Sequence, residues 1–338
     1  MKRARAAWLA LHLVAAWAHA PCPPDAVRDG LPLVQCDRSP PCVRWSYMTV
    51  EKCAELKRDE SWPTYDEHIR RNGHWASMRH LVHKHLQNKR LFIVGDSISN
   101  LWYRGLTCEA ARHGLTVAGW SADLALLRHQ VQAYAQDTWL GEPLPGQECV
   151  AFVETNTTLC LRGWHKFKAS DTDANLALAD VLLVNYALHY SNMGEYQTDM
   201  SALMAKMRDF NQRKRKLAVF RETSAQLFPN GGAYSPGAHK NADALCAPMN
   251  PSVMYDNFVW KQNEYVRSAA RAAGDVPVLA FYNVTLDRWN SLEQRFCEFE
   301  ARKSNPEGAC LDCTHLCTTP TFWAYHVQAL YELLEKHM

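Results

Sequence analysis

The fold class is indicated by the stretch Leu91-Phe92-Ile93-Val94-Gly95-Asp96-Ser97. Four consecutive apolar residues ended by a glycine are typical of a strand buried on both faces of a parallel sheet. Apolar residues at helical spacing over 98–113 predict a helix directly after this strand. A strand followed at once by a helix is the repeating unit of α/β folds.

The same alternation continues along the chain. Further buried strands are expected over 181–184, 217–220 and 276–282, and one or two strands over 149–167. Helices are expected over 78–87, 123–136, 194–214, 253–273 and 318–337, and a Gly- and Pro-rich loop over 224–250. This order predicts a mainly parallel sheet covered by helices on both faces, with ligands bound beyond the carboxyl ends of the strands.

Composition excludes several classes of protein. Of 338 residues, 47% are hydrophobic and 21% are charged, which argues against a disordered chain. The formal net charge is +2, from 37 Lys and Arg against 35 Asp and Glu, so binding of nucleic acid is not expected. The sequence shows no Gly-rich nucleotide loop, and no tightly bound cofactor is expected.

The N-terminus reads as a secretory leader. Lys2, Arg3 and Arg5 precede an apolar run over 6–18 and small residues up to Ala20, which predicts a signal peptide over 1–20. The run is shorter than the roughly 20 apolar residues that a membrane span needs. Contact with a membrane is therefore expected only if this segment stays uncleaved.

Twelve cysteines follow the leader, an even number that indicates disulfides in an oxidising compartment. Two N-glycosylation sequons, at Asn156 and Asn283, agree with this compartment. We therefore expect the protein in the secretory pathway, in the Golgi lumen or secreted. Residues 21–88 are rich in Cys and Pro and predict a disulfide-tied cap before the main domain over 89–338.

Ser97 is the first candidate for chemistry. A serine at a strand-to-helix turn lies at the carboxyl edge of the sheet, and the free N–H groups of the helix behind it suit an oxyanion. The alternative is that Ser97 only caps the helix. Both interpretations stay open on this tripeptide alone.

The second candidate is the segment Asp312-Cys313-Thr314-His315. A serine nucleophile needs a base, and the base needs an orienting carboxylate. Asp312 and His315 are three residues apart, so on one turn Asp312 can orient the imidazole toward Ser97. Disulfides from the crowded cysteines would hold this segment rigid. The alternative is a zinc site made by Cys310, Cys313, His315 and Cys317.

Other polar residues follow the remaining strands. Asn185 comes after the strand at 181–184 and is a candidate oxyanion donor, with His189 close behind it. Arg221 ends the strand at 217–220 and is a candidate for substrate contact or for an internal salt bridge. Tyr234 lies in the following loop and is a candidate rim residue.

These blocks together resemble a known family. The segment 91–100 resembles the first block of the SGNH (GDSL) hydrolase clan, and Asp312-Cys313-Thr314-His315-Leu316-Cys317 resembles the last block of its PC-esterase, or trichome-birefringence-like, branch. Asn185 with His189 resembles the middle block, and Cys36-Asp37 with Trp45 the cap of that branch. The middle loop reads Gln226-Leu227-Phe228 where related sequences often carry a histidine before the phenylalanine.

The resemblance implies a flavodoxin-like three-layer α/β/α sandwich and a Ser97–His315–Asp312 triad. It implies oxyanion donors from the Ser97 backbone, from Asn185 and from a glycine, for which Gly119, Gly146 and Gly163 are candidates. The activity implied is transfer of an acetyl group from a donor to a polysaccharide or glycoconjugate hydroxyl, through an acyl-serine. The alternatives are an acetyl-ester hydrolase acting on polysaccharides and a non-catalytic glycan-binding secreted protein.

Overall fold

The computed structural model describes residues 76–118, 147–229, 231–232, 246–286, 292–295, 311–316 and 320–338. The leader expected over 1–20, most of the cap over 21–88 and the helix over 123–136 lie outside these residues. No helix within the described ranges has the length and apolar character to cross a bilayer.

A seven-stranded sheet forms the centre of the fold, in the order β2-β3-β4-β1-β5-β6-β7. Five neighbouring strands run parallel: β4 (Thr157–Gly163), β1 (Arg90–Gly95), β5 (Val181–Val184), β6 (Leu217–Arg221) and β7 (Val278–Leu279). At one edge, β3 (Gln147–Phe152) and β2 (Val117–Ala118) are antiparallel. The prediction of an α/β domain with a mainly parallel sheet is confirmed.

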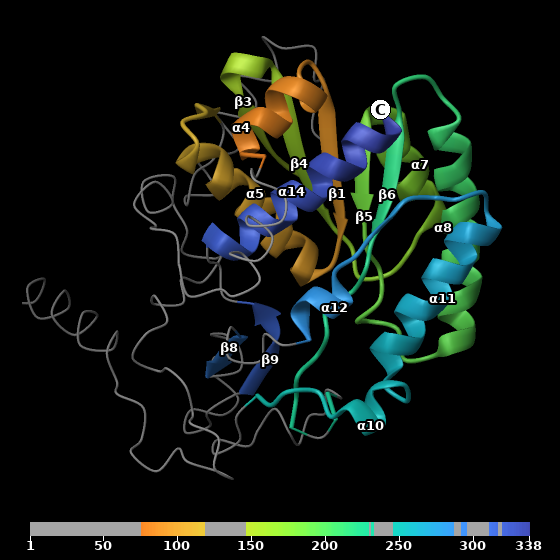
Figure 1. Cartoon of the computed structure of the whole chain (residues 1–338). Coiled ribbons are helices and arrows are strands. Elements are labelled where there is room, and N and C mark those ends of the chain that lie inside the picture. Colours follow the sequence, from red (N-terminus) through yellow and green to blue (C-terminus); the bar gives the residue numbers. More distant parts are fainter. Residues whose placement is uncertain are drawn as a thin grey trace, which may run out of the picture. The chain divides into compact units, whose positions relative to one another are not determined.

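Helices cover the sheet on both faces (Figure 1). On one face, α5 (Ser97–Arg112) packs against β1 and β4, and α14 (Pro320–His337) and α4 (Met78–Leu81) pack against α5. On the other face, α8 (Met193–Asn211) packs against β6 and lies between α7 (Ala169–Leu178) and α11 (Phe258–Ala272). Both faces of the strands are thereby removed from water, as their continuous apolar sequence predicts.

Alternate residues of each strand face one side of the sheet, and this alternation builds the core. Phe92 and Val94 of β1 share a buried cluster with Met200, Leu203 and Met204 of α8. Each such side chain contributes about 1.5–3 kcal/mol when it is fully buried. On the opposite face, a Cβ added to Gly105 would lie 2.2 Å from the Trp323 ring, so Gly105 allows α5 and α14 to approach each other closely.

The one or two strands expected over 149–167 are two antiparallel strands, β3 and β4, in which Cys149 and Cys160 are directly paired and disulfide-bonded. Two other expected elements differ from the structure. The strand expected over 276–282 is only β7, followed by a short helix α12 (Tyr282–Thr285). The Glu222 carboxylate accepts hydrogen bonds from the backbone N–H groups of Phe281 and Tyr282, which turns the chain away from the sheet.

The helix expected over 253–273 is also divided. It forms α10 (Pro251–Met254) and α11, because the Asn257 side chain accepts from the N–H groups of Val259 and Trp260 and starts a new helix there. Asparagine is among the preferred residues at this position of a helix. Sequence periodicity continued through the break and did not reveal it.

The described part of the cap segment belongs to the main domain. α4 continues into a π-helix, η2 (Val82–Leu86), and both pack against α14. The Lys84 Nζ atom lies 2.8 Å from Glu335 Oε2, and His85 Nε2 lies 3.0 Å from the same oxygen. The first and last described helices are therefore joined.

Candidate active site

Ser97 is the first residue of α5, directly beyond the end of β1. Asp96 caps the helix, because its Oδ1 atom accepts from the Ile98 N–H at 3.0 Å. Capping by Asp96 leaves Ser97 free of that role, so the alternative that Ser97 is the helix cap is wrong. Ser97 is half-buried, and its N–H belongs to the first turn, where amides have no partner within the helix.

Gly95 makes this turn possible. Its φ is +149°, and an added Cβ would lie 2.3 Å from the Asn185 carbonyl oxygen and 2.3 Å from Ser99 Oγ. Only glycine combines that backbone conformation with so close an approach of two neighbouring elements. The end of β1 is thereby packed against β5 and α5, and Ser97 is carried at the carboxyl edge of the sheet.

The structure brings Ser97 and His315 together. Ser97 Oγ lies 2.8 Å from His315 Nε2, although the two residues are 218 positions apart in the sequence. Both residues are half-buried, so the pair is partly shielded from water but remains accessible. This distance is that of a hydrogen bond between a hydroxyl and an imidazole, the arrangement that a nucleophilic serine and its base require.

His315 lies on β9 (Leu311–Leu316), which pairs with β8 (Leu292–Arg295) in a two-stranded antiparallel sheet separate from the seven-stranded sheet (Figure 1). The helical turn expected around Asp312 and His315 does not form, because both residues belong to strand β9. Asp312 pairs with Gln294 of β8, and the pairing is irregular between that position and Leu316, the stretch that contains His315. The Asp312 side chain lies outside the described residues. Its part in a triad therefore stays a prediction.

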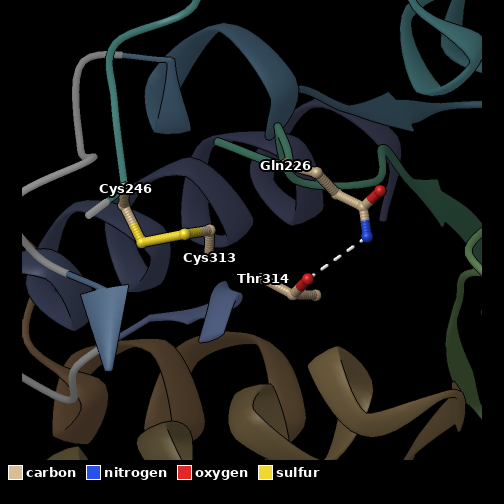
Figure 2. The surroundings of a disulfide bond; sticks show 4 residues. All are labelled: Gln226, Cys246, Cys313 and Thr314. Carbon is tan, nitrogen blue, oxygen red and sulfur yellow. Dashed lines mark hydrogen bonds between the residues drawn. A yellow bond between two sulfur atoms is a disulfide. The ribbon is translucent and has the colours of Figure 1, made fainter. Parts of the chain in front are cut away.

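The loop after β6 fixes β9 in place (Figure 2). The Leu227 N–H donates to the Cys313 carbonyl oxygen at 3.0 Å, and Gln226 Nε2 donates to Thr314 Oγ1 at 3.2 Å. A disulfide joins Cys246 to Cys313. These three links meet β9 at the two residues before His315, so they determine where the imidazole stands.

The disulfide also bears on the zinc alternative. Cys313 is oxidised, so it offers no thiolate to a metal ion, and Cys310 and Cys317 lie outside the described residues. No group of three or more candidate metal ligands occurs within the described ranges. All five cysteines of those ranges are disulfide-bonded.

The predicted oxyanion role of Asn185 does not agree with its contacts. The side chain is 1% exposed, and Nδ2 donates to the Arg221 carbonyl oxygen and to Thr223 Oγ1, both at 2.8 Å. Both amide protons are therefore engaged between β5 and the end of β6. Of the glycines considered, Gly163 is directly paired with Gly95 at the carboxyl edge, whereas Gly119 and Gly146 lie outside the described residues.

Arg221, a candidate for substrate contact or for an internal salt bridge, has a side chain that is 0% exposed. It forms no internal salt bridge with a described carboxylate. Its guanidinium lies over the Phe281 ring at 4.9 Å and donates to Ser99 Oγ at 3.2 Å. Glu222 pairs instead with Arg267 of α11. Tyr234, the third candidate for substrate contact, lies outside the described residues.

His189 is exposed at the carboxyl edge and stacks on His165, with ring centroids 4.0 Å apart and an angle of 10° between planes. Burial of part of the ring lowers the pKa of His189, the charges of His165 and Lys166 lower it further, and Asp96 opposes them. His165 was not singled out from the sequence. It follows β4 as His189 follows β5, and this shared position beside β1 is the signal that could have found it.

The two sequons lie at the surface. Asn156 is half-buried at the start of β4, where its Nδ2 atom donates to Asn88 Oδ1 at 3.1 Å, and Asn283 is exposed on α12. Glycosylation at either position stays a prediction.

Comparison with known proteins gives no assignment of family. No family model matches the chain, and no curated protein is significantly similar to it.

Proposed function

We propose that the chain is a serine-dependent acyltransferase that moves an acetyl group from a donor to a hydroxyl of a polysaccharide or glycoconjugate. The observation that carries the proposal is the 2.8 Å contact between Ser97 Oγ and His315 Nε2. A serine hydroxyl attacks a carbonyl efficiently when an imidazole removes its proton as the new bond forms. The contact therefore supplies the first requirement of acyl transfer.

In the proposed reaction, His315 takes the Ser97 proton while Oγ attacks the acetyl carbonyl. The tetrahedral intermediate then collapses, and the departing group leaves with the proton from His315. An acceptor hydroxyl next gives its proton to His315 and attacks the acyl-Ser97. The second tetrahedral intermediate collapses as His315 returns this proton to Ser97 Oγ, which releases the acetylated acceptor and restores the serine. Asp312 is proposed to orient the imidazole, on the basis of the family resemblance.

The oxyanion of each intermediate would lie at the N-terminus of α5. The Ser97 N–H and the positive end of the helix dipole favour negative charge there. Gly163 is the proposed glycine of the oxyanion site, because it pairs with Gly95 at the same edge of the sheet. Asn185 is not included.

Fold and compartment support the same proposal. Across the sheet the parallel strands lie in the order β4-β1-β5-β6-β7. When these five strands are numbered by their order in the chain, this is the order 2-1-3-4-5 of flavodoxin-like folds, which we propose for this domain. Disulfides persist in oxidising compartments. The proposed location is accordingly the Golgi lumen or the outside of the cell.

The proposal is tested with p-nitrophenyl acetate as donor and a panel of plant and microbial polysaccharides as acceptors. The assay follows p-nitrophenol, free acetate and polymer-bound acetyl groups. Ser97→Ala and His315→Ala are expected to reduce turnover by about 10³-fold or more, because nucleophile and base act as one unit. The fold of each variant is checked by circular dichroism.

Two matched variants serve as controls. Ser201 is exposed on α8, and His83 is exposed on η2. Ser201→Ala and His83→Ala are expected to keep the full rate. Acetyl appearing only as free acetate with every acceptor would favour the ester hydrolase, and folded Ser97→Ala protein with most of the wild-type rate would contradict the assignment.

A further inference from the structure

Arg221 is a buried cation beside the candidate site. Its guanidinium donates to the Glu222 carbonyl oxygen at 2.9 Å and to Ser99 Oγ at 3.2 Å, and it lies over the rings of Phe281 and Trp102 at 4.9 and 5.7 Å. No described carboxylate forms an ion pair with it at 4.0 Å or less. An arginine with 0% exposure and no direct counter-ion in the described part of the chain is costly to keep, so its charge calls for an explanation.

Asp96 is the buried anion that faces this cation. It is 3% exposed, and its Oδ2 atom has no hydrogen-bond partner among the described residues, while Oδ1 caps α5. Burial lowers the pKa of Arg221 to about 10, and the charge of Asp96 acts in the opposite direction. The two charges thus attract each other across the first turn of α5, although they are not hydrogen-bonded.

This turn is the one that carries Ser97. Ser99 Oγ lies against Gly95 and 3.4 Å from the Val94 carbonyl oxygen, so the donation from Arg221 ties the turn to β6. A carboxylate immediately before the nucleophile opposes formation of an oxyanion nearby. A buried cation close to that carboxylate offsets the opposing charge, and it does so effectively because the surroundings exclude water.

We infer that Arg221 is a positioning residue of this site, which holds Ser99 and offsets the Asp96 charge so that negative charge can develop at Ser97. The inference rests on the proposed function. Arg221 acts through the turn and through its charge, without touching the substrate.

Three variants separate charge from hydrogen bonding. Arg221→Lys keeps the charge, Arg221→Gln keeps a hydrogen-bond donor without the charge, and Asp96→Asn/Arg221→Gln removes both charges. Asparagine caps a helix as well as aspartate does, so the double variant preserves the start of α5. The first readout is the second-order rate constant for modification of Ser97 by a fluorophosphonate, and the second is the free energy of unfolding in urea.

Arg221→Gln is expected to slow modification of Ser97 roughly tenfold or more, the scale of a charge several Å away at an effective dielectric constant of about 20. Arg221→Lys is expected to stay within about threefold of the wild-type rate, and the double variant to recover most of the loss. A merely structural role of Arg221 predicts no such recovery. If Arg221→Gln does not fold, the modification rates of Arg221→Lys and of the double variant decide. Both rates are expected to be close to the wild-type rate, and a large loss in the double variant alone overturns the role of Arg221.

The outcomes keep the two proposals apart. Two results overturn the role of Arg221 and leave the proposed function standing. In the first, Ser97 of Arg221→Gln is modified as fast as Ser97 of the wild type. In the second, the double variant is modified no faster than Arg221→Gln. Absence of modification in the wild type instead counts against the proposed function. The pairing of Asp96 with Arg221 is then decided by the unfolding free energies of a further single variant, Asp96→Asn, of Arg221→Gln and of the double variant, because strictly additive changes overturn it.

Discussion

Gly95 is the residue on which the geometry of the site depends most. Its backbone conformation is one that side chains rarely adopt, and Asn185 and Ser99 occupy the space that a Cβ would need. The carbonyl oxygen of Asn185 is backbone and cannot rotate away. No larger residue therefore fits at position 95 unless the end of β1 moves.

We predict that Gly95→Ala lowers the free energy of unfolding by about 2–5 kcal/mol, through the unfavourable φ and overpacking. Gly163→Ala is the matched control. Gly163 pairs with Gly95 across β1 and β4, but an added Cβ there meets nothing within 4 Å. Urea unfolding of both variants provides the measurement, and equal losses would contradict this account of the turn.

Among single residues, the sequence predicted the positions that follow from a local pattern of strand and turn residues. Ser97 follows an apolar strand and a glycine, which is a local signal. The burial of Arg221 and the engagement of the Asn185 amide depend on which strands are neighbours in the sheet, β5 beside β6, and no local pattern contains that information.

Among the elements, β9 is the one that joins the site. It is not a strand of the central sheet, yet it carries His315 to the end of β1. Its position comes from the loop after β6, through Leu227, Gln226 and the Cys246–Cys313 disulfide. The position of the His315 imidazole is therefore determined by tertiary contacts and a disulfide bond rather than by pairing in the central sheet.

We predict that replacing Cys246 and Cys313 together by serine reduces fluorophosphonate modification of Ser97 by more than the loss of stability explains. The bond closes a sequence separation of 67, which corresponds to about 4 kcal/mol of unfolding free energy in the chain-entropy model. The rate is compared at a temperature where both proteins remain folded. The reason for the expected loss is that, among the described residues, the loop after β6 would then hold β9 only through the hydrogen bonds from Leu227 and Gln226.

The Cys149–Cys160 disulfide provides the control. It joins β3 to β4 across a separation of 11, for about 3 kcal/mol in the same model. Its replacement by two serines should cost stability and leave the rate of the folded protein unchanged. Equal rate losses in the two double variants would contradict a specific role for the bond at Cys313.

Elements were predictable where the apolar pattern was uninterrupted. The expected strand over 181–184 matches β5, and the helix over 194–214 is α8, which begins one residue earlier and ends three residues earlier than expected. The division between α10 and α11 and the short β7 were not predictable. Both follow from single side chains, Asn257 and Glu222, that redirect backbone N–H groups.

For the molecule as a whole, the contact between η2 and α14 joins the first described helix to the last. His85 is 8% exposed and faces Glu335 from α14, with Lys84, Lys89 and His80 also nearby. Burial lowers the pKa of His85 from its ordinary value of 6.5, and the Glu335 carboxylate opposes this effect. The folded protein thus favours the neutral imidazole.

A lowered pKa in the folded state means that the unfolded chain binds the proton more readily. We predict that the contribution of His85 to stability is complete above pH 6.5 and decreases as the pH falls from 6.5 toward the lower pKa of the folded state. His85→Gln should therefore reduce the slope of unfolding free energy against pH in this window. His83→Gln, exposed on the same helix, is the control, and an equal change in both slopes would contradict the prediction.

The proposed chemistry depends most directly on Ser97 being a nucleophile activated by His315. The measurement that tests it is mass-spectrometric mapping of the residue modified when the intact protein reacts with a fluorophosphonate, in the wild type and in His315→Ala. We predict one adduct, on Ser97, and its loss in His315→Ala. Absence of an adduct on Ser97, or undiminished modification without the imidazole, would contradict the account.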